Sequence, residues 1–510
     1  MRIGVLATGG TIACHGKPLR PLAVTEFAGA VDRLLTPALQ AQFTDLDLVF
    51  LPALDFPGGS LDSTNLQPAD WVTIATAIVT GYEAVDGWVV LHGTDSMDFS
   101  AGALSFLLND WDERGIAVAQ LSKPVVLTGS QLPLLADTPD GWVLRANTDA
   151  YQNFCGAVAA VYRGVPEVCV YFGDKLMRGN RAVKSHANQF DAFASPNYPL
   201  LGQGGVQMQI DPSHILPGPT HQASSLDDEP VRAQLLDQLE QLKARIGEAR
   251  VMRFSAFPAP FSDRTNLIAD LLQACIDTGV GGIVLESYGE GNFPAGATAS
   301  QTGASRAVLK RAIEQGVVVI DCTQVGAGKV EQLAYAAGTW LNEVGALPAM
   351  DMTVMACLTK LTVVKAKAAL RGWDENVLSR LLQLDLVGEC AMRSRLVPHS
   401  NPELLPRARL AALDGSAYLR NDEYAGPVLE TDDGRVLWRL LRDEADEEAQ
   451  LPGKLALNDD GVARFRGRDG TVLWRMAGTL LELAGSYRAG NLCLRLEGDD
   501  EVLLYQQAAD

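Results

Sequence analysis

A threonine hydroxyl is the first candidate nucleophile in this chain. Thr8-Gly9-Gly10-Thr11-Ile12 follows the apolar run RIGVLA, and its two glycines permit a sharp turn and the close approach of a ligand. Thr11 would then stand at the end of a buried strand, although a free threonine hydroxyl is a weak nucleophile that needs a base or a polarising network. Taken alone, the motif is more typical of a Gly-Gly turn whose threonines cap the next helix.

Two further motifs supply groups that can activate such a hydroxyl. His92-Gly93-Thr94-Asp95 follows the apolar run GWVVL, and its carboxylate can orient a lysine or bind the ammonium of an amino acid. Lys184 lies in a polar stretch after another apolar run, and a lysine in a closed site can act as a base when its pKa falls. The plainer alternatives are a helix-capping Asp95 and a solvated surface Lys184.

Motifs for other kinds of chemistry are missing from the sequence. It contains no G-x-S-x-G, H-E-x-x-H, Walker P-loop or G-x-G-x-x-G opening a helix after a strand. The six histidines are dispersed, so an acid–base site built on histidine is not expected. We therefore expect no metal and no cofactor.

The elements around these motifs predict an α/β protein. Short apolar runs alternate with helical stretches, such as 68–83, which indicates a mostly parallel sheet flanked by helices in a larger N-terminal domain, 1–200. Ligands of such sheets bind beyond the carboxyl ends of the strands, where the polar motifs fall. A linker and connecting helix, 201–250, lead to a smaller α/β domain, 251–390.

The end of the chain has a different texture. After a second linker, 391–415, DGRVLWR at 433–439 returns as DGTVLWR at 469–475, a period of 36 residues, and a fainter third copy ends at Tyr505. Asp-Gly before an apolar run is typical of a turn followed by a strand, so residues 416–510 are predicted to form a small all-β repeat module.

Composition limits the partners and the compartment. With 62 acidic and 42 basic residues the formal charge is −20, which disfavours nucleic acid and anionic membranes as partners. The eight cysteines form no C-x-x-C pair and are expected to be buried free thiols of a reducing compartment. Because the first residues lead directly into a strand and no long uncharged apolar stretch occurs, we expect a cytoplasmic protein without a membrane span.

Several blocks together resemble one family. ATGGTI (7–12), VVLHGTDSM (89–97) and RGNRAVK (178–184), in this order and spacing, resemble the signatures of bacterial-type L-asparaginases. Further segments are similar to the cytosolic, type I, branch: 61–71, 125–133, 190–197, 282–294 and 352–361. The resemblance covers about residues 1–390.

The resemblance implies roles for particular residues. Thr11 would be the nucleophile that forms an acyl-enzyme with the side-chain amide carbonyl of the substrate. Thr94 would be a second catalytic threonine linked to Lys184, and Asp95 would hold this network and the substrate ammonium. The family usually has a tyrosine in the loop after TGGTI, and the corresponding stretch here, 13–27, contains none.

The same resemblance implies substrate contacts and an assembly. Ser63 would bind the substrate α-carboxylate, alongside Thr94 and Asp95, and Asn292 would close the site from a neighbouring subunit. A homodimer or homotetramer is therefore expected. The C-terminal module faintly resembles the repeats of bulb-type mannose lectins but lacks their sugar-binding pattern, which favours a stabilising or oligomerising role.

Three functions remain open from the sequence. The first is hydrolysis of L-asparagine to L-aspartate and ammonia. The second is a related amidohydrolase, either a glutaminase-asparaginase that also accepts L-glutamine or the asparaginase-like subunit of a tRNA amidotransferase. The third is a catalytically weak sensor that binds an amino acid, in keeping with the absent loop tyrosine.

Overall fold

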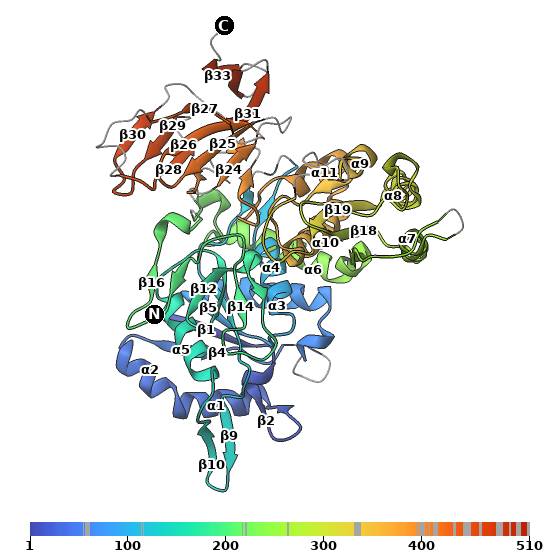
Figure 1. Ribbon diagram of the computed structural model, residues 1–510. Coiled ribbons are helices and arrows are strands. Elements are labelled where there is room, and N and C mark those ends of the chain that lie inside the picture. Colours follow the sequence, from blue (N-terminus) through green and yellow to red (C-terminus); the bar gives the residue numbers. More distant parts are fainter. Residues whose placement is uncertain are drawn as a thin grey trace.

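Two α/β domains and a C-terminal set of β-sheets make up the computed structural model (Figure 1). The structure describes residues 1–510 except 55, 57–61, 114, 116, 217, 220–221, 263–264, 331–337, 394, 397–402, 407, 412–416, 432–434, 442–449, 458–461, 476–482, 489–490, 496–500 and 507–510. For the last three strands only the backbone is described.

The larger domain is built on an eight-stranded sheet in the order β16-β15-β12-β11-β8-β5-β1-β4. Its strands are β1 (Arg2–Ala7), β4 (Asp47–Phe50), β5 (Gly87–Leu91), β8 (Val125–Thr128), β11 (Val168–Phe172), β12 (Lys175–Arg178), β15 (Gly202–Gln203) and β16 (Gln209–Ile210). The five strands from β4 to β11 are parallel, and the remaining three are antiparallel. Every residue of β5 and β11 is buried, as expected for strands covered by helices on both faces.

Helices cover both faces of this sheet. They are α1 (Val24–Leu34), α2 (Thr36–Gln42), α3 (Pro68–Thr80), α4 (Met97–Leu107) and α5 (Ala150–Val161). Successive residues of β5 point to opposite faces: Val90 packs with α3 and α4, and Val89 packs with α1 and α5. Helix α3 begins at Pro68 behind a capping box formed by Gln67 and Asp70.

Short elements lie between these. They are β2 (Cys14–His15), β3 (Arg20–Pro21), β6 (Asp110–Trp111), β7 (Ala117–Ala119), β9 (Leu135–Thr138), β10 (Gly141–Leu144), β13 (Val183–Lys184), β14 (Phe193–Ala194) and the 3-10 helices η1 (Thr11–Ala13), η2 (Ser63–Asn65), η3 (Tyr82–Ala84), η4 (Gly179–Arg181), η5 (Pro212–His214) and η6 (Gln222–Ser224).

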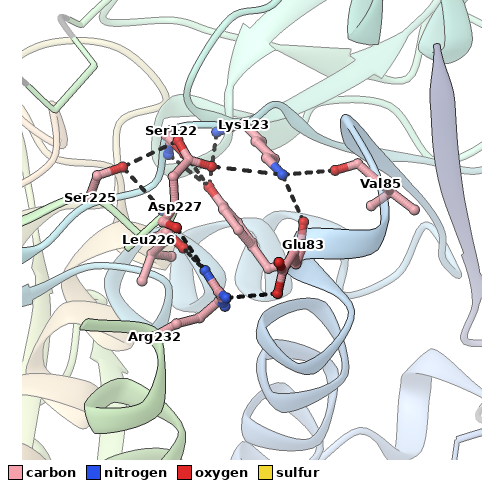
Figure 2. A network of polar contacts seen from close by, with 9 residues as sticks. Glu83, Val85, Ser122, Lys123, Ser225, Leu226, Asp227 and Arg232 are labelled. Carbon is pink, nitrogen blue, oxygen red and sulfur yellow. Dashed lines mark hydrogen bonds and ion pairs between the residues drawn. The ribbon is translucent and has the colours of Figure 1, made fainter. Parts of the chain in front are cut away.

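A polar network anchors the connection between the two α/β domains (Figure 2). Arg232 of the connecting helix α6 (Glu229–Arg245) donates to the carbonyl of Leu226 at 2.9 Å and to the carboxylate of Glu83 at 3.2 Å. Lys123 donates to the carbonyls of Tyr82 and Val85 at 2.8 and 2.9 Å. The bond of Arg232 to Glu83 holds α6 against the residues before β5. The bonds of Lys123 join the residues before β8 to those before β5.

The smaller domain is a four-stranded parallel sheet with helices around it. Its elements are β17 (Val251–Ser255), β18 (Gly282–Ser287), β19 (Val318–Thr323), β20 (Leu347–Pro348), η7 (Ile246–Ala249), α7 (Leu267–Asp277), η8 (Ser300–Thr302), α8 (Ala304–Glu314), α9 (Thr339–Val344), α10 (Val354–Arg371) and α11 (Glu375–Gln383). Helix α10 packs against α4 of the larger domain, where buried Lys367 donates to the carbonyl of Phe106 at 3.1 Å and pairs with Asp110 at 3.0 Å. The two α/β domains are therefore joined along the helix that follows the His92–Asp95 motif.

The C-terminal part is all-β, as predicted. Its strands are β21 (Met392–Arg393), β22 (Arg395–Leu396), β23 (Glu403–Leu404), β24 (Arg409–Ala411), β25 (Ala417–Asp422), β26 (Gly426–Thr431), β27 (Val436–Arg439), β28 (Lys454–Leu457), β29 (Ala463–Arg466), β30 (Val472–Arg475), β31 (Leu483–Arg488), β32 (Asn491–Arg495) and β33 (Glu501–Gln506). Three antiparallel meanders, β25–β27, β28–β30 and β31–β33, each carry a register shift in the pairing of their last two strands. Asp433, Gly434 and the side chain of Tyr505 lie outside the described residues.

The architecture confirms the predicted fold class, and some details differ from the expected layout. Strands β15 and β16 extend the large sheet into the range predicted as a linker, and β21 to β24 fall within the predicted second linker. These strands are only two or three residues long, too short to give a periodic pattern. Cys169, Cys322 and Cys357 are buried free thiols and Cys390 is buried, whereas Cys14, Cys155 and Cys275 are half-buried.

Candidate active site

The candidate motifs meet at a crossover point of the large sheet. From β1 the chain goes first to β4 on one side and then to β5 on the other, so the carboxyl ends of β1 and β5 form a crossover point, where sheets of this kind commonly bind ligands. Ala7 pairs with Leu91 in the register of these strands, and the amide of Thr8 donates to the carbonyl of Leu91 at 3.0 Å. The turns that carry Thr11 and Thr94 therefore leave the sheet at the same level.

Glycines bring these turns into contact. Gly10 has a φ of +84°, and a Cβ there would lie 2.4 Å from the amide nitrogen of Gly93. A Cβ on Gly93 would in turn lie 2.3 Å from the hydroxyl of Ser63. The neighbours of these glycines, Thr11 and Thr94, are thus held on adjoining turns with Ser63 against them, and a side chain at either glycine would separate them.

Lys184 joins the second motif through its ammonium. It donates to the hydroxyl of Thr94 and to the carboxylate of Asp95, each at 2.8 Å, from β13. The side chain of Lys184 is 17% exposed and that of Asp95 is 60% exposed, so the carboxylate faces the open side of the site. Three of the four predicted catalytic residues therefore form one hydrogen-bonded set, and Lys184 is not a free surface lysine.

Asp98 is a member of the site that the sequence reasoning missed. Its carboxylate accepts the backbone amide of Lys184 at 3.0 Å, from the first turn of α4. Burial raises the pKa of Asp98, and the amides of Lys184 and Phe99 oppose that shift. The available signal was its place three residues after Asp95, on the buried face of the helix that follows the motif.

His92 has a structural place rather than an acid–base one. Its Nδ1 lies 2.7 Å from the carbonyl of Gly93, which can only accept, so Nδ1 carries the proton. Its Nε2 then accepts from the hydroxyl of Ser100 at 2.9 Å. Burial lowers the pKa of His92 to about 4, so the ring is neutral near pH 7.

The thiol nearest the Thr11 turn is protonated at neutral pH. Cys14 donates to the carbonyl of Gly10 at 3.3 Å. Burial, and secondly the charge of Asp62, raise the pKa of Cys14. Because the thiolate is the reactive form of cysteine, Cys14 is a poor candidate for a nucleophile.

Buried arginines hold the segment that leads to Lys184. Arg178 pairs with Glu167 at 2.6 Å and donates to the carbonyl of Gly388 at 3.3 Å. Arg181 donates to the same carbonyl at 2.9 Å and pairs with Asp351 at 3.1 Å. The position of Lys184 thus depends on residues that close the smaller domain, far along the chain from the lysine itself.

Asn292 stands apart from this set. It lies after β18 in the smaller domain, where its side-chain amide donates to the carbonyl of Gly289 at 2.9 Å. Its described hydrogen-bond partners include none of the residues around Thr94. The described contacts therefore bring Thr11, Ser63, Thr94, Asp95 and Lys184 to one edge of the sheet, and they include no bond from Asn292 to these residues.

Within the described part of the chain, no group of three or more His, Cys, Asp and Glu side chains is arranged to hold a metal ion. Among the helices that the structure describes, none is long and apolar enough to cross a membrane.

Comparisons with known proteins identify the family of this chain. Residues 2–215 match the family described as asparaginase, N-terminal, and residues 265–371 match the glutaminase/asparaginase C-terminal domain. L-asparaginase 1 of Escherichia coli K12 is 33% identical over 332 residues, which are 64% of this chain and 82% of the relative. A glutamyl-tRNA(Gln) amidotransferase subunit of Aeropyrum pernix is 30% identical over 404 residues, 77% of this chain and 80% of the relative.

Among solved structures, the thermostable L-asparaginase of Thermococcus kodakarensis has a TM-score of 0.57 at 26% identity, over 76% of this chain and 99% of that one. The two domain models match in chain order, and one relative is covered over most of its length. Together these matches establish the family. The chain belongs to the asparaginase family of amidohydrolases.

Proposed function

We propose that this amidohydrolase hydrolyses L-asparagine to L-aspartate and ammonia, with Thr11 as the nucleophile. The observation that carries the proposal is the ammonium of Lys184, which is shared between the hydroxyl of Thr94 and the carboxylate of Asp95 on the turn that adjoins Thr11. A charged donor at such a place polarises hydroxyls and stabilises developing negative charge.

The chemistry would run in two halves. The hydroxyl oxygen of Thr11 attacks the side-chain amide carbonyl, its proton passes through the hydroxyl of Thr94 to the amide nitrogen of the substrate, and backbone amides of the two Gly-containing turns stabilise the oxyanion. The C–N bond then breaks and ammonia leaves with the added proton. Water attacks the resulting ester of Thr11, which releases aspartate and restores the hydroxyl.

Substrate recognition rests on the groups around this centre. In this proposal the buried hydroxyl of Ser63 binds the α-carboxylate, and the exposed carboxylate of Asp95 binds the ammonium. In this proposal Asn292 closes the site of a neighbouring subunit in a homodimer or homotetramer. We propose that the reaction takes place in the cytoplasm on the free amino acid and needs no cofactor.

A second candidate comes from the relative that is a glutamyl-tRNA(Gln) amidotransferase subunit. In that case the same threonine chemistry would release ammonia for a partner protein. The formal charge of −20 disfavours direct binding of tRNA by this chain, so the first proposal is the stronger one.

Ammonia release from L-asparagine and L-glutamine, measured side by side, tests both proposals. Thr11→Val preserves the shape of the side chain and removes its hydroxyl, so kcat should fall by ~10³ or more while folding survives. Thr73→Val is a matched control, because its hydroxyl bonds the carbonyl of Ala69 within α3, away from the site. A Thr11→Val enzyme with more than about a tenth of the activity would contradict the nucleophile, on the scale expected for deleting one.

A further inference from the structure

A cavity of about 490 Å³ lies where the three parts of the chain meet, within the size range of ligand sites. The larger domain contributes residues 195–200, and the smaller domain contributes Lys329 and Asp351. Ala391 and Arg409, at the start of the β-module, complete the lining. None of these residues belongs to the candidate amidase site.

Hydrogen bonds fix the walls of this cavity. The side chain of Asn197 donates to the carbonyl of Asp351 at 2.9 Å and accepts the amide of Gly328 at 2.8 Å, which sets the place of Lys329. The carboxylate of Asp351 accepts the amide of Ala391 at 2.8 Å and pairs with Arg181 at 3.1 Å. The cavity is thus a built junction of three segments rather than a gap between loose loops.

The lining favours an anion. Lys329 and Arg409 are cationic, while the charge of Asp351 is balanced by Arg181 behind it. Arg409 reaches Glu430 at 3.4 Å, and both oxygens of that carboxylate accept from Arg420 at 3.0 Å. In a chain with a formal charge of −20, a cavity lined by two cations and one carboxylate is a local exception.

Much of the remaining lining is apolar. It includes Pro196, Tyr198, Pro199 and Leu200, and the guanidinium of Arg178 lies over the ring of Tyr198, 4.4 Å from its centroid. An apolar lining that also carries two cations suits a small organic molecule with a carboxylate or phosphate on an apolar body.

The cavity is also linked to the catalytic lysine. Residues 195–200 directly follow β14, in which Phe193 pairs with Lys184 of β13. Arg181, three residues before Lys184, holds Asp351 in the cavity wall. A ligand that moves either wall therefore acts on the strand that carries Lys184.

We propose that this cavity binds a small organic anion and that its occupancy changes turnover by shifting Lys184. The binding stands on the cavity alone, whereas the effect on turnover rests on the proposed function. The two can fail separately, because binding is measured without any amide substrate.

Calorimetric titration of the full chain tests the binding. Phenyl phosphate and benzoate share an apolar body and differ in the anionic group, inorganic phosphate has the charge alone, and benzyl alcohol has the body alone. We expect at least one of the two aromatic anions to bind about tenfold more tightly than benzyl alcohol, because a charge-assisted bond is then made. No binding of any anion at millimolar concentration would overturn the proposal.

Variants locate the site. Lys329→Ala should weaken binding of the anion by about tenfold, and Arg409→Ala by a similar factor. Lys310→Ala is the matched control, because Lys310 is an exposed lysine on α8 that pairs with Glu314 one turn away. Circular dichroism verifies that each variant is folded. Binding that both cavity variants leave unchanged, or that saturating L-aspartate abolishes, would put the anion elsewhere and overturn the proposal.

Kinetics then test the coupling. Saturating anion should change kcat or KM for L-asparagine by about twofold or more in the parent chain and not in Lys329→Ala. Tight binding with unchanged kinetics in an active enzyme would overturn the link to Lys184. Absence of amidase activity would count against the proposed function and leave the calorimetric result standing.

Discussion

Lys184 is the residue on which most of the candidate chemistry converges. Its ammonium bonds Thr94 and Asp95, and its backbone amide bonds Asp98. Because its backbone is held by Asp98, the Lys184 ammonium cannot move away from Thr94 without also changing its bond to Asp95. At the scale of residues the site therefore behaves as one unit.

The first prediction follows from that unit. Thr94→Val and Lys184→Met should each remove most of kcat, and the double variant should be scarcely worse than either single one, because members of a catalytic network are not additive. Steady-state rates of ammonia release measure this, with Lys310→Ala as a control for the loss of an exposed lysine. Losses that simply multiply would make Lys184 a structural neighbour rather than a catalytic group.

The second prediction concerns His92 and pH. Its pKa is lowered by burial from 6.5 to about 4 in the folded protein, so below pH 6.5 the unfolded chain binds the extra proton. The contribution to stability is complete above pH 6.5 and is lost as the pH falls towards 4. Between pH 7 and pH 5 this amounts to about 2 kcal/mol.

Denaturant unfolding at both pH values measures it. The loss of stability on acidification should be smaller in His92→Asn than in the parent chain, since asparagine has no proton to gain. Subtracting the pH-dependent change in unfolding free energy of the variant from that of the parent chain removes the contributions of the other titrating groups, among them Asp98. Equal losses in the two proteins would show that His92 is already protonated, or is solvated, in the folded state.

At this scale the sequence indicated the candidate residues more clearly than the residues that support them. The chemistry of the Thr94, Asp95 and Lys184 side chains can be inferred from residue type alone. The family resemblance then implied that the three residues act together. Asp98 and Asp351 look like an ordinary helix residue and an ordinary loop residue, because their role comes from backbone amides at Lys184 and Ala391. Partners so distant along the chain leave no local pattern.

Turns rather than strands determine how the site is assembled at the scale of elements. β1 and β5 run to the same level, and the turns after them are close enough that Gly10 has no room for a Cβ. The apolar runs predicted these strands because buried parallel strands are continuous in hydrophobic residues. The direct contact of Gly10 with Gly93 could not be predicted, because it depends on which strands are neighbours in the sheet.

Gly10→Ala is the third prediction. The new Cβ would lie 2.4 Å from the amide nitrogen of Gly93, and a φ of +84° is strained for any L side chain. The two turns must separate, so kcat should fall by about tenfold or more, and stability should fall by about 1–2 kcal/mol from backbone strain. Ammonia release and denaturant unfolding give the two values.

Gly29→Ala is the matched control. Gly29 lies within α1, and a Cβ there meets nothing within 4 Å. Alanine should therefore leave activity unchanged and raise stability by about 0.5–1 kcal/mol, from its higher helix propensity. A Gly10→Ala enzyme that resembled this control would mean that the two turns do not need their close contact.

At the scale of the whole molecule, both apolar packing and polar contacts join the two α/β domains to the β-module. Leu404, Leu405 and Leu410 of the module belong to one continuous buried cluster with Leu201 and Met208 of the large domain. Figure 1 shows the module, orange to red, at the upper left, above the large domain and beside the smaller one. The resemblance of its repeats to lectins stays a prediction, and its placement favours a stabilising role.

The last prediction is the removal of that module. A chain that ends at Ser400 keeps Thr11, Thr94 and Lys184, and the hydrogen-bond partners of Lys184 all precede that point. Its kcat should stay within a factor of ~3 of the full chain, since no group that contacts the substrate is lost. Stability should fall, because apolar surface around Leu201 and Met208 becomes exposed, and the oligomer can change for the same reason.

Light scattering, thermal unfolding and ammonia release on the two chains separate these effects. The truncated chain should also lose the response to an aromatic anion, because Arg409 is absent from the cavity wall. The full chain should be a dimer or tetramer, since Asn292 is proposed to close the site of a neighbouring subunit. A soluble, correctly assembled truncation with no turnover would show that the module supports the catalytic arrangement itself, through the Asp351–Arg181 link that leads to Lys184.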